Sequence, residues 1–215
     1  MNSLSTLWAA RDVFLSGIGT SLVLVGLCLL ISLPLAMLIY VVLQECARGF
    51  ARTARLLLDA MRCVPFLLLA YVVYYGLPVV GVRLEAFSAG LLSLTVYHAA
   101  YFAEIMRSAT TAIPPETLTA AEAFGFTRFK RYRRIVLPQL LAVAAPVLVN
   151  QAVMVIKDSA LLMVITVQEI TFAANFVSTN EFSPFAPFLL AMLLYWLMSL
   201  VTDRWIGRLG HIRMR

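Results

Sequence analysis

The sequence predicts an all-α, polytopic membrane protein with about five transmembrane helices, its N-terminus outside and its C-terminus in the cytoplasm. Of its 215 residues, 62% are hydrophobic and only 13% are charged, whereas a typical soluble domain has about 25% charged residues. Apolar runs of about 20 residues, the length that crosses a bilayer, recur along the chain. We therefore expect residues 1–215 to form a single transmembrane domain.

The first two predicted spans are residues 13–43 and 56–76. Residues 13–43 hold no charged side chain and are long enough to cross a bilayer with tilt. Residues 56–76 are apolar except for Asp59 and Arg62, which lie three positions apart and can pair on one helix face. We interpret these two side chains as an interfacial ion pair rather than as part of a transport path.

The third predicted span, residues 86–106, carries polar side chains at depth. Tyr97, Tyr101 and Glu104 recur at helical spacing, so they share one face. Ionisable residues inside a membrane are costly and normally face a bundle interior or a water-filled path. Tyr97 and the neighbouring His98 are therefore candidates for a substrate path, although a histidine bonded to an adjacent helix would explain the same pattern.

Residues 112–134 form the longest polar interval between predicted spans. Proline at the first turn of a helix loses only an N–H that would have no partner, and glycine suits a left-handed helix end. The interval should contain two short helices, although a plain hairpin between spans is the simpler alternative. The expected signals are Pro114 and Pro115 at a helix start, Thr119 with Glu122 as a capping box, Gly125 at the helix end and Thr127 as a second cap.

The remaining predicted spans are residues 135–156 and 184–202. Lys157 and Asp158 follow the first of these as adjacent opposite charges, which makes them candidates for a gate or path pair. Residues 159–180 contain too many polar interruptions to span a bilayer. We expect them to form a short helix packed at the outer side.

Thirteen of the 17 Lys and Arg residues gather at three places separated by apolar runs. Because cytoplasmic loops carry an excess of Lys and Arg, about five spans would put all three clusters inside. This distribution explains the net charge of +6 without any nucleic-acid partner. The clusters are Arg48, Arg52 and Arg55; Arg107, Arg128, Lys130, Arg131, Arg133 and Arg134; and Arg204, Arg208, Arg213 and Arg215.

The sequence lacks the common motifs of catalytic and metal-binding proteins. No stretch matches an ATP-binding P-loop, a zinc protease or a serine hydrolase, so we expect no catalytic residue and no bound metal or cofactor. Cys28, Cys46 and Cys63 lack metal-ligand spacing. A stand-alone channel or secondary transporter is an alternative, and it should show repeated intramembrane acids or inverted repeats. We find no such repeat.

The polar interval resembles the cytoplasmic signature of ABC importer permeases, A-A-x-x-x-G followed by a basic run and I-x-L-P. The matching residues are Ala120, Ala121, Gly125, Ile135, Leu137 and Pro138. The glutamate that usually precedes the alanines is Thr119 here. The resemblance implies that residues 112–138 couple the membrane domain to a separate ATPase, through Thr119, Ala120, Ala121, Glu122 and Gly125.

Further stretches resemble the polar amino-acid uptake branch of that family, which includes histidine, glutamine, arginine and opine permeases. Residues 100–107 match A-Y-x-x-E-x-x-R, and residues 157–170 resemble K-D-[TS]-[SA]-L…I…E-[LI]. In the first match, a boundary pair between Glu104 and Arg107 competes with direct substrate contact as the role of Glu104.

The resemblance implies the fold of ABC type I importer permeases and a transporter subunit that is not itself an enzyme. Its substrate would be a polar or basic amino acid or a derivative, and ATP and Mg would bind the partner ATPase. The expected partners are an ATP-binding cassette subunit dimer, a second permease copy or paralogue, an extracytoplasmic solute-binding protein and the lipid bilayer of the bacterial plasma membrane. Half of the translocation pathway would include Tyr97, His98, Tyr101, Glu104, Lys157 and Asp158.

Overall fold

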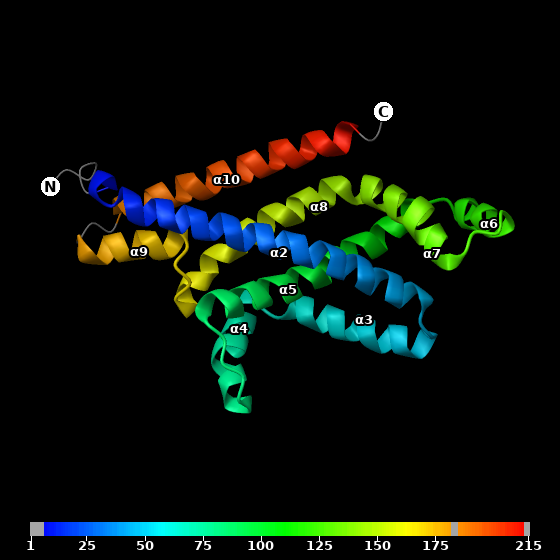
Figure 1. Cartoon of the computed structure of the whole chain (residues 1–215), viewed down its shortest axis with the longest axis horizontal. Coiled ribbons are helices and arrows are strands. Elements are labelled where there is room, and N and C mark those ends of the chain that lie inside the picture. The colour runs from blue at the N-terminus through cyan, green and yellow to red at the C-terminus, as the bar shows by residue number, and fades with distance from the viewer. Residues whose placement is uncertain (1–6, 182–184, 213–215) are drawn as a thin grey trace.

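The computed structural model describes residues 7–181 and 185–212, and throughout these ranges the regular elements are helical (Figure 1). The α-helices are α2 (Arg11–Glu45), α3 (Arg48–Cys63), α4 (Phe66–Tyr71), α5 (Ala86–Ala109), α6 (Pro115–Ala123), α7 (Arg128–Arg131), α8 (Leu137–Ser159), α9 (Ile170–Asn180) and α10 (Phe185–Ile212). Short π or 3-10 turns join them at η1 (Val72–Gly76), η2 (Leu77–Val80), η3 (Thr110–Ala112), η4 (Tyr132–Val136) and η5 (Ala160–Ile165).

Helix α2 runs along the length of the bundle. Figure 1 shows α6 and α7 at one end of the molecule and α9 with the start of α10 at the other. Within the described residues, four helical segments are long and apolar enough to cross a membrane, and a bent pair could supply a fifth span. The four are Arg11–Glu45, Ala86–Ala112, Arg128–Ile165 and Phe185–Arg204. An all-helical polytopic membrane architecture is thereby confirmed.

Burial separates the central helix from the outer ones. In the most apolar window of α5, 61% of the residues are buried, whereas the corresponding value for α10 is 11%. Apolar side chains that remain exposed on α10, such as Trp196 and Leu197, suit contact with lipid. The main core lies between α2, α5 and α8, and a smaller core joins the start of α2 to α9 and α10.

The predicted second span, residues 56–76, is wrong as a single straight helix. Helix α3 begins at Arg48 and ends at Cys63, and α4 begins at Phe66 after a bend of 101°. Pro65 explains the break, because the residue before a proline is driven out of the helical region, and Val64 has φ −78° and ψ 133°. In Figure 1, α4 therefore points away from the bundle, across its long axis.

The last two predicted segments agree with the observed helices in outline. The expected short helix within residues 159–180 is α9, which follows η5 and a left-handed Thr166 with φ 66°. The last helix, α10, begins at Phe185. The predicted starting residue, 184, lies outside the described residues, as does Arg213 of the third basic cluster.

Candidate functional site

His98 lies at the centre of a polar contact between α5 and α8. Its side chain is fully buried, although it is polar. The Gln151 amide nitrogen lies 3.0 Å from its Nδ1. When that amide donates, the ring proton sits on Nε2, which lies 3.4 Å from Oδ2 of Asp158. The structure thus brings together two predicted path residues, His98 and Asp158, that are 60 positions apart in the printed sequence.

The predicted pairing of Lys157 with Asp158 is not formed. Within the described residues the Asp158 carboxylate lies beside the His98 ring and forms no ion pair with Lys157, which is exposed near the end of α8. Adjacent residues on a helix diverge by about 100°, so two neighbouring charges do not face each other. The long-range contact with α5 therefore replaces the local one.

Aromatic rings line the same face of α5. The rings of Phe66 and Tyr97 have centroids 5.3 Å apart, and those of Tyr97 and Tyr101 are 5.0 Å apart. The Tyr101 hydroxyl donates a 2.9 Å hydrogen bond to the backbone carbonyl of Arg62, at the end of α3. The helical spacing that placed Tyr97 and Tyr101 on one face is thus confirmed.

A chain of alternating charges continues from these rings toward the end of the bundle that carries α6. Arg62 Nη1 lies 3.0 Å from Asp59 Oδ1 and 3.6 Å from Glu104 Oε2. Arg107 Nε donates to Glu104 Oε2 at 2.7 Å. Both predicted ion pairs, Asp59 with Arg62 and Glu104 with Arg107, are therefore confirmed, and Arg62 links them.

These charges border a cavity of about 530 Å³ between α2, α3 and α5. Its polar lining offers both signs of charge together with hydroxyl and amide groups, a combination suited to a zwitterion. The polar residues that line it are Tyr40, Gln44, Arg55, Asp59, Glu104, Arg107, Thr110 and Thr111.

Helix α6 occupies the tip of the predicted coupling loop (Figure 1). It starts at Pro115, as predicted, with Pro114 preceding it. It ends at Ala123 and is terminated by the left-handed Gly125, which has φ 71°, also as predicted. The amide of Gly125 donates to the Glu122 carbonyl and that of Phe126 to the Ala121 carbonyl, which together form a Schellman motif.

The predicted capping box is wrong. Thr119 lies inside α6, and its hydroxyl donates to the Pro115 carbonyl at 3.3 Å. The prolines start the helix four residues earlier, so Thr119 cannot act as its cap. Thr127 does precede α7 with extended backbone angles, but its side chain makes no capping hydrogen bond.

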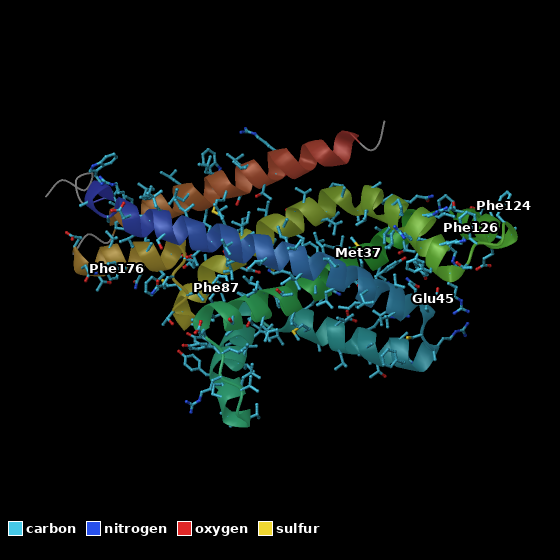
Figure 2. The ribbon with its side chains drawn as sticks, viewed as in Figure 1. Met37, Glu45, Phe87, Phe124, Phe126 and Phe176 are labelled. Atoms are coloured by element: carbon cyan, nitrogen blue, oxygen red, sulfur yellow. The ribbon has the colours of Figure 1, made fainter. Side chains whose placement is uncertain are left out.

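The five predicted coupling residues do not share one surface. Thr119, Ala120, Glu122 and Gly125 are exposed, whereas Ala121 is buried at 3% exposure. The side chain of Phe124 is 83% exposed at the helix end and is drawn there in Figure 2. The outer surface of α6 therefore includes a large aromatic ring that sequence reasoning did not single out.

At the opposite end of the bundle, the buried carboxylate of Glu169 caps α9. It accepts hydrogen bonds from the amides of Thr171 at 2.7 Å and Phe172 at 2.8 Å, and from the Tyr195 hydroxyl of α10. Burial raises the pKa of Glu169, while these donors favour its ionised form. Sequence reasoning assigned no role to Glu169, although a charge among apolar residues was an available signal.

A comparison with known protein families identifies the family of this chain. The family described as "Binding-protein-dependent transport system inner membrane component" matches residues 47–211. The chain belongs to this family. It is accordingly a multi-pass inner membrane component of a transport system and not the ATPase, which confirms the family predicted from the loop signature.

Several bacterial permeases are similar to this chain in sequence. The chain is 35% identical over 143 residues to the probable amino-acid ABC transporter permease YckA of Bacillus subtilis, covering 66% of this chain and 63% of YckA. It is 34% identical over 154 residues to PatM of Vibrio harveyi, with 70% and 69% covered. It is 33% identical over 160 residues to the octopine permease OccM of Rhizobium meliloti, with 70% and 65% covered.

Solved structures show the same fold over nearly the whole chain. The crystal structure of an amino acid ABC transporter with histidines matches with a TM-score of 0.87 and 25% identity, covering 98% of both chains. The MetNI methionine transporter matches with a TM-score of 0.74 and 18% identity, covering 97% of this chain and 94% of that one. The predicted ABC importer permease fold is therefore confirmed.

Proposed function

We propose that this permease forms half of the translocation pathway of an ATP-driven importer for polar or basic amino acids or their derivatives. The observation that carries the proposal is the polar track from Asp158 and the fully buried His98 to the partly exposed Glu104, in a chain of the binding-protein-dependent family. Ionisable side chains inside a membrane bundle are costly and mark substrate or ion paths. The relatives named for amino-acid and octopine transport support this substrate class.

The path begins at the contact between α5 and α8. Asp158 is partly exposed, and its carboxylate offers a partner for an ammonium or guanidinium group. The Nε2 atom of His98 lies 3.4 Å from that carboxylate, and Gln151 contacts the other ring nitrogen of His98, Nδ1. The rings of Tyr97 and Tyr101 supply an apolar wall for the methylene groups of a side chain.

The cavity beside Glu104 forms the inner part of the path. Arg55 and Arg107 offer donors to a carboxylate, and Asp59 and Glu104 offer acceptors to an ammonium group. The two acidic side chains form ion pairs, Asp59 with Arg62 and Glu104 with Arg107. The ammonium and carboxylate groups of a zwitterion can take the place of these partners, so that no charge is left unpaired. Lys157, next to Asp158 in the last turn of α8, is kept as a candidate for the outer part of the path.

Helix α6 is the proposed contact for the ATPase dimer. Thr119, Ala120 and Glu122 are exposed on it, and the left-handed turn at Gly125 fixes where it stops. Ala121 is buried, so it supports the exposed face of α6 and does not itself meet the ATPase. ATP and Mg belong to that partner, and an extracytoplasmic binding protein and a second permease copy or paralogue complete the complex.

The proposed orientation puts the α6 end in the cytoplasm. Counting the bent pair of α3 and α4 as one span gives five spans, which puts the chain termini on opposite sides. Arg52, Lys130 and the C-terminal basic cluster then lie inside, whereas Arg83 lies outside.

Reconstitution tests the proposal. The permease would be placed in liposomes with a cognate ATPase and binding protein, and uptake of radiolabelled glutamine, histidine, arginine and octopine measured with and without ATP. We expect ATP-dependent uptake of at least one probe, and a loss of about tenfold or more in Asp158→Asn, because a lost charge-assisted contact costs about 1.5–3 kcal/mol. Uptake that needs neither ATP nor the partners would contradict the proposal.

A further inference from the structure

Paired charges join α6 to the far end of α2. Glu45 is the last residue of α2, and its carboxylate lies 3.0 Å from Arg128 Nη1 and 3.3 Å from Arg131 Nη2. The other guanidinium nitrogen of Arg131, Nη1, pairs with Glu122 on α6. Arg131 thus bridges two carboxylates from elements far apart in sequence, in the region labelled by Glu45 and Phe126 in Figure 2.

Arg131 is held in place more firmly than its neighbours. Its side chain is only 14% exposed, whereas that of Arg128 is 79% exposed. Its Cζ atom lies 5.8 Å from the ring centroid of Tyr132. The planar guanidinium can direct separate donors at two acceptors, which a single ammonium group does less well. Arg133, on the same turn, is exposed and forms no ion pair with any described residue.

The helix dipole alone disfavours a glutamate at position 45, the last residue of α2. The C-terminus of a helix carries partial negative charge, so a carboxylate there is unfavourable. The last turn of α2 holds no basic residue that could offset it. The compensating charges come instead from Arg128 and Arg131, which makes the contact with the loop the stabilising partner of this helix end.

In the sequence, α6 lies between α5 and α8, and α2 is not one of its neighbours. Residues 113–114 lead into α6 from η3, and residues 124–127 lead from it into α7 and then α8. Helix α2 continues to the opposite end of the bundle, where Ser21 accepts a 3.3 Å hydrogen bond from the Ile170 amide of α9. A displacement of α6 that also moves α2 would therefore reach α9.

We propose that Arg131 is a positioning residue that ties α6 to α2, so that displacement of α6 by the ATPase moves α2 together with its α9 contact. The inference rests on the proposed function, since it assigns a transmission role within the same coupling loop. Without the tie, α6 would act only on α5 and α8, and ATP hydrolysis would be less tightly linked to uptake.

The test measures ATP hydrolysed per amino acid imported, in the reconstituted complex, with whichever of the four radiolabelled probes the wild type imports. Arg131→Gln and Glu45→Gln should each raise this ratio about tenfold, and the double variant should raise it about as much as either single variant. Arg131→Lys should fall between. Arg133→Gln, which removes the same charge from the same turn, should leave the ratio unchanged.

The ratio separates a positioning role from a merely structural one, because loss of folded protein lowers hydrolysis and uptake together. A wild-type ratio in folded Arg131→Gln would overturn the proposal, as would an equal effect of Arg133→Gln or multiplicative effects in the double variant. Should Arg131→Gln fail to fold, Glu45→Gln and Arg131→Lys decide by the same criterion. Failure of the wild-type complex to import any probe would instead contradict the proposed function, before any variant is compared.

Discussion

The two ends of α2 are joined to their neighbours by different forces. At the α9 end, Gly17 packs directly against the backbone of Glu169, and the contact is buried. At the α6 end, Glu45 meets Arg128 and Arg131 through long charged side chains. Close backbone packing is intolerant of small changes in volume, whereas partly exposed ion pairs contribute little to stability.

The difference predicts that the ends respond differently to mutation. Changes at the α9 end should lower the free energy of unfolding, because buried donors, acceptors and packed atoms lose their partners. Changes at the α6 end should leave the protein folded and alter how it responds to the ATPase. Stability and coupling can therefore be measured separately on one helix.

The largest loss of stability is expected for Glu169→Ala. This change removes the buried cap of α9 and leaves the partly buried amides of Thr171 and Phe172 without their acceptor, at a cost of about 3 kcal/mol. Thermal unfolding in detergent measures the effect. Glu169→Gln keeps an acceptor oxygen and should lose less than half as much, so equal losses in the two variants would contradict the capping role.

Gly17→Ala should cost about 1–3 kcal/mol through overpacking. A Cβ atom at Gly17 would lie 3.0 Å from the Glu169 carbonyl oxygen, and backbone cannot move away cheaply. The matched control is Gly19→Ala in the same helix, where no atom lies within 4 Å of the added Cβ. Unfolding midpoints that fall equally for both would show that α2 and α9 are not closely packed.

At the α6 end, Gly125→Ala should cost about 1–2 kcal/mol locally, since an alanine there must keep a left-handed conformation. Gly49→Ala is the control, because neither glycine has an atom within 4 Å of the added Cβ and only Gly125 has positive φ. Hydrogen exchange of α6 should accelerate in Gly125→Ala alone. Unchanged exchange in α6 would mean that Gly125 does not fix the helix end.

The smallest effect is expected for Arg128→Gln, below about 1 kcal/mol, because an exposed ion pair is screened by water and salt. Its side chain is 79% exposed and shares Glu45 with the more buried Arg131. Thermal unfolding at low and high salt checks this. A loss as large as that of Gly17→Ala would erase the contrast between the two ends.

The sequence was most informative where structure is decided locally. Pro115 and Gly125 fix the start and end of α6 through their own backbone preferences, so both could be predicted. The length and apolarity of α2 and α5 likewise revealed candidate spans. The failed capping box at Thr119 shows the limit, because two nearby helix-start signals competed and the prolines prevailed.

Contacts between distant segments were not predictable in the same way. The pattern indicated that His98 was a path candidate, but its contacts with Gln151 and Asp158 depend on how α5 and α8 pack. The bridge from Glu45 to Arg131 joins residues 86 positions apart, so no local spacing could indicate it. The bend after Cys63 was signalled by Pro65, yet the apolar run around it favoured a continuous span.

Cysteine labelling tests most directly whether the α6 end faces the ATPase. In a background with Cys28, Cys46 and Cys63 replaced by alanine, single cysteines at Thr119 and Arg83 would be treated with a membrane-impermeant maleimide in right-side-out and inverted vesicles. We predict labelling of Thr119→Cys only in inverted vesicles and its protection by the bound ATPase, with Arg83→Cys labelled only in right-side-out vesicles. Labelling of Thr119→Cys from outside would contradict the account.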